Sequence, residues 1–376
     1  MSKQKTPGKE IIAGVQLRVR GLVQGVGFRP FVWKAAREFE IKGRVLNDAS
    51  GVLIDAWGNP ENLERFVEKI EHGNLPLARV DSIDRSELAG EMPLAFQIES
   101  SVDGNMHTSI AAEAATCADC IEDTLAASNR RFRYAFTNCT HCGPRLSIIK
   151  SVPYDRCNTS MAEFELCSAC RREYEDPADR RYHAQATACS ECGPQLSLRK
   201  SASTGTETDS FPKCDAIDLA ASLILQGEIL AVKGLGGFQL CCDASNHTAV
   251  NRLRQRKKRF EKPFALMAKN LEMVRRYCNL SDAESALLSS SSAPIVLLEA
   301  MSNHTLSTAI APAVNTLGFM LPNTPLHHLL LNGVDRPLLV TSGNLSDEPQ
   351  AISNLLAQEK LGELAGWHRR SHQMPW

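Results

Sequence analysis

The sequence has no long hydrophobic run, almost no net charge and no apolar leader at its start. The longest apolar runs, such as residues 293–298, are far shorter than the roughly 20 residues that cross a bilayer, which argues against a transmembrane helix. The 42 basic and 43 acidic side chains leave a net charge of −1, so local clusters must hold any nucleic acid or other anion. Residues 1–10 are polar and lack the features of a secretory signal, so we expect a cytoplasmic protein without membrane contact.

Cysteine, in contrast, is abundant, and eight of the 13 cysteines form four C-x-x-C pairs. A shift of 50 residues superimposes the first two pairs on the last two, so the stretch is a tandem repeat of one module. Each copy reads C-x2-C, 18 residues, C-x2-C, the spacing at which two knuckles enclose one zinc ion. The expected ligands are Cys117, Cys120, Cys139 and Cys142 in the first cysteine module, and Cys167, Cys170, Cys189 and Cys192 in the second.

Four disulfides are the alternative interpretation of these pairs. The missing secretory signal favours a reducing compartment, where disulfides do not persist. Because all the ligands are sulfur and no position is left for water, we expect two structural Zn²⁺ ions rather than catalytic ones. His141 is an alternative ligand, and the other cysteines are interpreted as buried thiols: Cys157, Cys214, Cys241, Cys242 and Cys278.

Before the cysteine modules, alternating apolar residues from Val15 predict a strand, followed by a glycine-rich loop and an amphipathic helix. The loop glycines allow backbone N–H groups to turn inward as an anion nest at the helix start, and Arg29 adds a bidentate phosphate ligand. The spacing fits neither the dinucleotide fingerprint nor the P-loop. A hairpin at 42–58, a second helix and two strands near 78–86 and 95–99 complete the ferredoxin-like order β-α-β-β-α-β.

Residues 15–100 resemble the acylphosphatases, whose signature is this loop ending in F-R together with an asparagine on the second strand. By this resemblance Arg29 and the loop amides hold the phosphate of an acyl phosphate, and Asn47 orients the attacking water. The loop residues are Gln24, Gly25, Val26, Gly27 and Phe28. The alternative is a surface arginine and a turn asparagine without a catalytic role.

Two polar stretches, 101–115 and 199–214, are predicted linkers on either side of the cysteine modules at 116–198. From residue 215 helical patterns alternate with buried strands, and a basic run lies at 252–262. By itself such a run indicates a solvated helix face. With the polar turn at 341–344, however, it resembles the YrdC/Sua5 family, a twisted α/β fold whose K-x-R and S-x-N motifs line a nucleotide site. The matching residues are Lys257, Arg259, Ser342 and Asn344, with Lys262 and Lys233 as further candidates. Members make carbamoyl-type adenylates from ATP with Mg²⁺, and some bind RNA.

The succession of these three units resembles the HypF family, the carbamoyltransferases of [NiFe]-hydrogenase maturation. The resemblance implies a multidomain α+β enzyme that hydrolyses carbamoyl phosphate and activates the carbamate with ATP as carbamoyl adenylate. The carbamoyl group then passes to the C-terminal cysteine of a partner, HypE. Two alternatives are a zinc-containing RNA-binding protein, in which the cysteine modules and the basic run at 252–262 bind RNA, and a threonylcarbamoyl-adenylate synthase of tRNA modification. The doublets Arg130-Arg131 and Arg180-Arg181 inside the modules either contact nucleic acid or pack against the knuckles and cap them.

The end of the chain departs from the family pattern. Family members continue through the rest of the YrdC-like domain into a large transferase domain, whereas this sequence ends at Trp376. Its last 11 residues show neither helical nor strand periodicity. We therefore expect an incomplete YrdC-like domain at 215–365, an aberrant disordered tail at 366–376 and a disordered segment at 1–14. Without the final domain, the chain is expected not to carbamoylate HypE.

Overall fold

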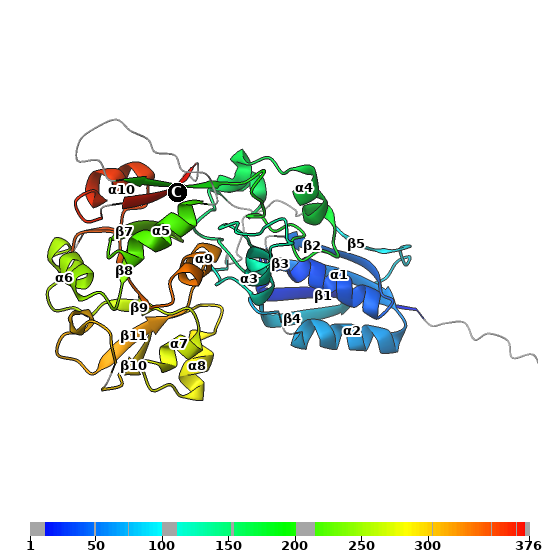
Figure 1. Cartoon of the computed structure of the whole chain (residues 1–376). Helices are drawn as coiled ribbons and strands as arrows, with labels where there is room; N and C mark the ends of the chain where they lie inside the picture. The colour runs from blue at the N-terminus through cyan, green and yellow to red at the C-terminus, as the bar shows by residue number, and fades with distance from the viewer. Residues whose placement is uncertain are drawn as a thin grey trace, which may run out of the picture.

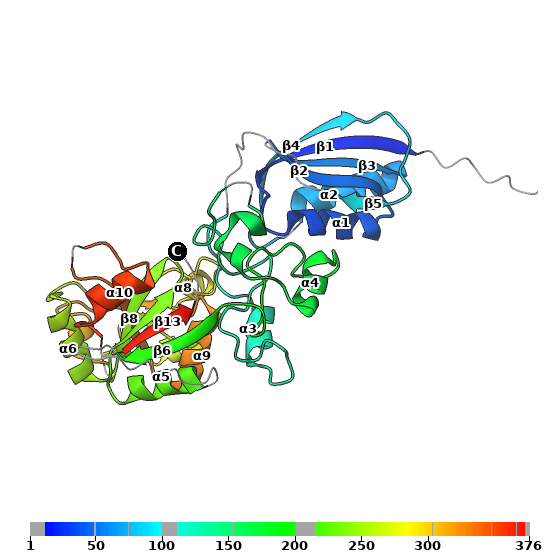
Figure 2. The same cartoon turned by 90° about the horizontal axis from the view of Figure 1, so that it is seen from above.

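The computed structural model describes residues 12–48, 50–73, 75–99, 111–151, 154–200, 215–302, 304–346, 348–365 and 367–372. An N-terminal and a C-terminal domain, each built on a sheet, lie on either side of the cysteine modules (Figures 1 and 2). Most of the two predicted linkers and of the predicted disordered N-terminus lies outside the described residues. Within the described ranges, no helix combines the length and apolar character needed to cross a membrane.

The N-terminal domain has the predicted ferredoxin-like arrangement, with five strands in the order β4-β1-β3-β2-β5. Both helices pack on one face of the sheet (Figure 2), where Leu17, Ile54 and Phe66 are completely buried. The elements are β1 (Ala13–Leu22), α1 (Phe28–Glu38), β2 (Lys42–Asp48), β3 (Gly51–Gly58), α2 (Pro60–His72), β4 (Arg79–Glu87) and β5 (Phe96–Ile98). This order brings the loop between β1 and α1 beside the end of β2, because β1 and β2 both pair with β3.

The two cysteine modules contain little regular structure and pack against each other with approximate twofold symmetry. In each, a helix begins directly after the first cysteine: α3 (Ala118–Leu125) and α4 (Ser168–Glu175). Between the modules lie two short turns of 3₁₀ helix, η1 (Arg156–Asn158) and η2 (Ser160–Glu163). The arginine doublet of each module extends into the other module, so the repeat also sets the contact between its two copies.

The exchanged arginines make equivalent bonds in the two directions. Arg131 donates through Nε to the carbonyl of Ala188 (3.0 Å) and through its other nitrogens to Glu173. Arg181, the residue 50 positions later, donates to the carbonyl of Asn138 (3.2 Å) and pairs with Asp123. The doublets therefore pack between the modules, and this use of their hydrogen-bond donors speaks against the RNA-gripping alternative.

The C-terminal domain is built on an eight-stranded mixed sheet in the order β10-β11-β9-β12-β8-β7-β13-β6. Two separate cores cover its faces: α5 and α9 contribute to one, and α6, α7 and α10 to the other. The elements are β6 (Gln195–Lys200), α5 (Asp215–Leu225), β7 (Leu230–Gly234), β8 (Gly237–Asp243), α6 (His247–Arg256), β9 (Ala265–Met267), α7 (Leu271–Arg275), α8 (Asp282–Leu288), β10 (Val296–Glu299), η3 (Thr308–Ile310), β11 (Thr316–Met320), α9 (Pro325–Gly333), β12 (Leu338–Ser342), α10 (Asn354–Leu361) and β13 (Trp367–His372).

The prediction of a disordered tail is wrong for residues 367–372. They form β13, which pairs in parallel with β7 and antiparallel with β6. A strand with a partner on each side has its backbone groups satisfied by the neighbouring strands, so it needs no alternation of apolar and polar residues to form. The absence of a strand period in the sequence therefore did not exclude a strand at these residues. Strand β6 comes from the end of the second cysteine module, so residues 195–200 also belong to this sheet.

Candidate active sites

The glycine loop lies between β1 and the N-terminus of α1, the position at which the sequence predicted an anion nest. Gly25 and Gly27 have φ angles of 71° and 77°, the left-handed region in which glycine carries no steric penalty. Gly27 is the N-cap of α1, where no side chain caps the helix, so first-turn N–H groups are left to bind an anion. The Gln24 amide donates to the carbonyls of Asp48 and Gly51 at 3.0 Å each, which ties the loop to the β2–β3 turn.

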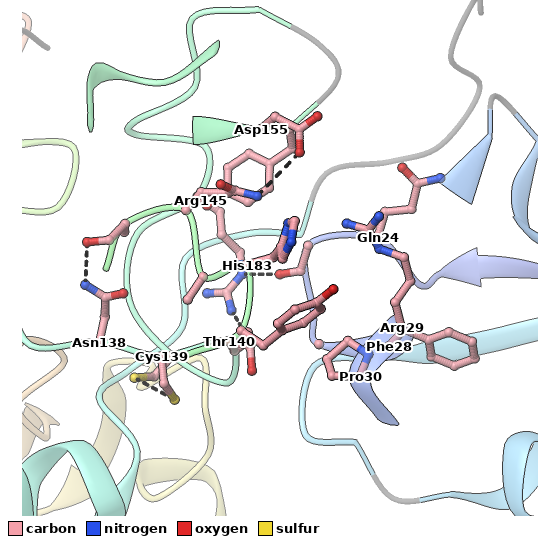
Figure 3. Close-up of a pocket in the computed structure, with 18 of the residues that line it drawn as sticks. Gln24, Phe28, Arg29, Pro30, Asn138, Cys139, Thr140, Arg145, Asp155 and His183 are labelled. Carbon is pink, nitrogen blue, oxygen red and sulfur yellow. Dashed lines mark hydrogen bonds between the residues drawn. The ribbon is translucent and has the colours of Figure 1, made fainter. Parts of the chain in front are cut away.

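Arg29 and Asn47 line one cavity with this loop, a compact space of about 60 Å³ (Figure 3). Burial lowers the pKa of Arg29, and the charge of Asp155 acts in the opposite direction; a guanidinium nevertheless stays charged at neutral pH. The side-chain oxygen of Asn47 is buried, and no donor among the described residues reaches it. A buried acceptor of this kind is suited to hold a water molecule, since leaving it unpaired is costly.

The cysteine modules form the other wall of this cavity, which the sequence did not predict. Thr140 packs on Gly27, where an added Cβ would lie 2.9 Å from its Oγ1, and Tyr154 packs on Gly25. The guanidinium of Arg145 donates to the carbonyl of Gly25 at 3.1 Å. The remaining lining side chains from this region include Asn138, Asp155, Tyr182, His183 and Gln185. The cavity beside the glycine loop is therefore enclosed between the N-terminal domain and the cysteine modules.

The eight predicted zinc ligands form two groups of four. Within each group the sulfur atoms all lie within 4.8 Å of one another, and several pairs are separated by 3.6–3.9 Å. Zinc bound tetrahedrally at about 2.3 Å from each sulfur requires a sulfur–sulfur separation of about 3.8 Å. The donor sets therefore fit zinc. Arg130 and Arg180 donate to the sulfurs of Cys170 (3.0 Å) and Cys120 (3.2 Å) in the opposite module, which offsets the negative charge of a four-thiolate site.

In the C-terminal domain, the predicted K-x-R and S-x-N motifs meet at Lys257. Its ammonium donates to the carbonyls of Ser342 and Asn344 at 2.7 and 2.6 Å and to Asn344 Oδ1 at 2.8 Å. Burial lowers the pKa of Lys257 to about 8, with a further contribution from the charge of Arg259. Arg259 donates to the carbonyls of Lys262 and Pro263, and the side chain of Lys262 is exposed. These residues lie close together, and their role in binding a nucleotide stays a prediction.

Lys233 lies at the same edge of the sheet as Ser342. Strands β7 and β12 both pair antiparallel with β8, so they run in the same direction and end at this edge. Lys233 is almost completely buried, and burial lowers its pKa to about 8. It lines a second cavity of about 60 Å³, whose other wall comes mainly from the first cysteine module and includes Ala186 of the second. Asn138, Pro144 and Ala186 line both this cavity and the one that contains Arg29.

Comparison with known proteins accounts for these three units in order. The acylphosphatase family matches residues 15–98, and the family described as HypF finger matches residues 116–149 and 166–199. The Sua5/YciO/YrdC family, described as telomere recombination, matches residues 222–367. The acylphosphatase of Oceanobacillus iheyensis is 42% identical over 87 residues, which are 23% of this chain and 96% of that protein.

Two proteins extend the likeness over almost the whole chain. The carbamoyltransferase HypF of Rhodobacter capsulatus is 51% identical over 351 residues, or 93% of this chain. The chain belongs to the HypF family. The crystal structure of a full-length HypF in the phosphate- and nucleotide-bound form matches with a TM-score of 0.89 and 40% identity over 98% of the chain. The chain spans 46% of the Rhodobacter protein and 48% of that crystal structure, a little under half of each.

Proposed function

We propose that this HypF-family chain hydrolyses carbamoyl phosphate at the Arg29 cavity and activates the released carbamate with ATP, as its Mg²⁺ complex, near Lys257. The observation that carries the proposal is the pair of neighbouring cavities that share Asn138, Pro144 and Ala186 in their linings. One of them contains the acylphosphatase-type loop, and the other reaches the sheet edge where the nucleotide motifs meet. The likeness to a HypF with bound phosphate and nucleotide supports the assignment of both ligands.

The first site acts by positioning and by charge. The loop N–H groups and the Arg29 guanidinium hold the phosphoryl oxygens, and they stabilise the charge that develops on them as the bond to the carbamoyl group breaks. Asn47 accepts a hydrogen bond from the attacking water and holds it in line. A mixed anhydride is already activated, so this site needs no strong general base. The products are inorganic phosphate and carbamate.

The second step needs protection from water. Carbamate and its adenylate decompose in solution, and a closed passage between the sites preserves both. Lys233, a buried cation in the second cavity, suits an anion that arrives from the first. Lys257, Arg259 and Lys262 neutralise the triphosphate, and Ser342 with Asn344 fixes the phosphates or the ribose. The carbamoyl adenylate then donates its carbamoyl group to the cysteine of HypE, in a step that also requires the rest of a full-length protein.

Zinc supplies cross-links in this scheme and takes no part in the chemical steps. Each ion holds the two knuckles of one module together, and the exchanged arginines hold the modules to each other. This assembly keeps the wall that covers the phosphate loop in place. We accordingly propose two structural zinc ions, one for each cysteine module.

Separate activities test the two sites. Arg29→Ala should lower phosphate release from carbamoyl phosphate by a factor of 100 or more, about 3 kcal/mol, as expected when an electrostatic anchor is removed. Lys257→Ala and Asn344→Ala should lower the carbamoyl-phosphate-dependent exchange of pyrophosphate into ATP while phosphate release continues. Turnover retained in Arg29→Ala would place the hydrolytic site elsewhere, and equal loss of both activities in the other variants would argue against two sites.

A further inference from the structure

The internal repeat provides a comparison for one residue of the first cavity. Arg145 and Gln195 stand at the same position of the two modules, three residues after the last cysteine of each. Gln195 donates its amide hydrogens to the carbonyls of Ser190 (2.6 Å) and Gly193 (3.2 Å). Arg145 donates to the equivalent carbonyls, those of Thr140 (2.7 Å) and Gly143 (3.0 Å). Both side chains therefore hold the second knuckle of their own module.

Arg145 makes one bond more, and this bond leaves the module. Its Nε donates at 3.1 Å to the carbonyl of Gly25, in the glycine loop of the N-terminal domain (Figure 3). Gln195 has two amide hydrogens and uses both on its knuckle, so it has no donor left for a third partner. Arg145 is 2% exposed. A buried charge needs its donors satisfied, and the knuckle carbonyls and the loop carbonyl meet that need together.

The bond to Gly25 fixes the direction of a loop amide. In a planar trans peptide the C=O and the following N–H point in opposite directions, so holding the Gly25 carbonyl also holds the N–H of Val26. Glycine restrains its own peptide weakly, because it tolerates many backbone conformations. A tether from outside the loop therefore limits a rotation that the loop sequence itself permits.

We propose that Arg145 is a positioning residue for the acyl phosphate: from the first cysteine module it orients the Gly25–Val26 peptide so that the Val26 N–H faces the phosphate. It also adds a second positive charge to the wall of the cavity that contains Arg29. This inference rests on the proposed function, in which the loop binds phosphate. It assigns to the module a direct part in substrate affinity, in addition to its structural part.

The sister module suggests the variant that tests this assignment. Arg145→Gln installs the residue of Gln195, which keeps the two knuckle bonds and removes only the loop bond and the charge. In this variant we expect the KM for carbamoyl phosphate and the dissociation constant of inorganic phosphate to rise about tenfold, the effect of losing one charge-assisted hydrogen bond. The kcat should change less than KM, and zinc content and thermal midpoint should match those of the wild type.

Two further variants separate position from charge and from knuckle stability. Arg145→Lys keeps the charge but lacks the planar fork that reaches three carbonyls, so its KM should also exceed that of the wild type. Gln195→Ala removes the equivalent knuckle bonds in the second module and should leave phosphate release unchanged. A wild-type KM in zinc-loaded Arg145→Gln overturns the proposal. If that variant loses zinc, a wild-type KM in zinc-loaded Arg145→Lys overturns it instead.

Calorimetric titration with inorganic phosphate distinguishes this inference from the proposed function. If the wild type binds phosphate but releases none from carbamoyl phosphate, the proposed reaction fails, and the phosphate affinities of the variants still decide the role of Arg145. If the wild type turns over carbamoyl phosphate and Arg145→Gln binds phosphate equally well, the proposed function stands and the role of Arg145 is overturned.

Discussion

Substitution of Arg131 tests most directly which contacts hold the two cysteine modules together. It is 1% exposed, and its guanidinium bonds to both carboxylate oxygens of Glu173, at 3.1 and 2.5 Å, and to the carbonyl of Ala188. Arg131→Met fills a similar volume without the charge and leaves a partly buried carboxylate short of partners. Breaking one side of a buried ion pair costs about 3–5 kcal/mol. We expect a cost at the lower end of this range, because Arg130 also contacts Glu173, at 2.8 Å, and remains as a partner.

The assay is urea unfolding at a fixed excess of zinc, followed by the release of zinc to an indicator dye. A loss of about 3 kcal/mol should lower the midpoint by about 1–2 M urea. Glu173→Gln should have a similar effect. The double variant should be less destabilised than the sum of the two single variants, by about 1 kcal/mol or more, because both remove the same interaction.

Arg171 provides the matched control. It is an arginine of the second module, next to Cys170, but its side chain is 51% exposed and its carboxylate partners lie at 3.8 Å. Arg171→Met should change the free energy of unfolding by about 0.5 kcal/mol or less. If Arg131→Met costs no more than Arg171→Met, the exchanged arginines do not hold the modules together, and the reasoning from their burial fails.

Three further outcomes are expected. Gly27→Ala should weaken phosphate binding, measured by calorimetry, and destabilise the chain by about 1–2 kcal/mol. The reason is that φ is 77° at this position and the new Cβ would lie 2.9 Å from Thr140 Oγ1. A phosphate affinity in the variant equal to that of the wild type would contradict the geometry of the loop. Cys120→Ser should lower the zinc content from two ions per chain to about one, by metal analysis, and a wild-type chain without zinc would refute the metal sites. ATP binding should weaken as pH rises through about 8, where the Lys257 ammonium loses its proton. Its folded-state pKa lies below the ordinary value of about 10.4, so the free energy of unfolding should increase as pH rises from about 8 to about 10.4. Over the same pH range Lys257→Arg should keep more of its ATP affinity than the wild type does.

The sequence was most informative where a site is local in the chain. The zinc ligands follow from C-x-x-C spacing, and their grouping in fours is confirmed. The glycine loop predicted a nest before α1, and Gly25 and Gly27 adopt the required backbone conformation. In such stretches a few consecutive residues specify both the backbone conformation and the ligand or donor groups of the site, so the prediction depends little on tertiary packing.

The sequence was least informative about contacts between domains. Nothing in the local pattern around Arg145 or Asn138 indicates that these residues face a glycine loop more than 110 residues earlier. The strand at Trp367–His372 was missed for a related reason, since its stability depends on pairing with β6 and β7 rather than on its own periodicity. The convergence of Lys257 with Asn344 was expected from a family resemblance, and not from the spacing of the residues themselves.

Comparison of the two modules separates scaffold from function more clearly than either module does alone. Residues that serve the contact between modules keep their chemistry in both copies: Arg131 and Arg181 are identical, and their partners Glu173 and Asp123 are both acidic. Two residues that line the first cavity do not keep their chemistry, since Arg145 and Asn138 correspond to Gln195 and Ala188. The Asn138 amide donates to the carbonyls of Phe136 and Ala186, which are themselves equivalent positions, so one asparagine serves both copies at their junction.

In a duplicated module, the residues that form the contact between the two copies must stay complementary to each other, so their chemistry is kept. Residues that face a different domain are not under this constraint and can differ between the copies. The asymmetric positions are therefore where variants should change affinity for substrate, whereas the symmetric ones should change stability and zinc retention.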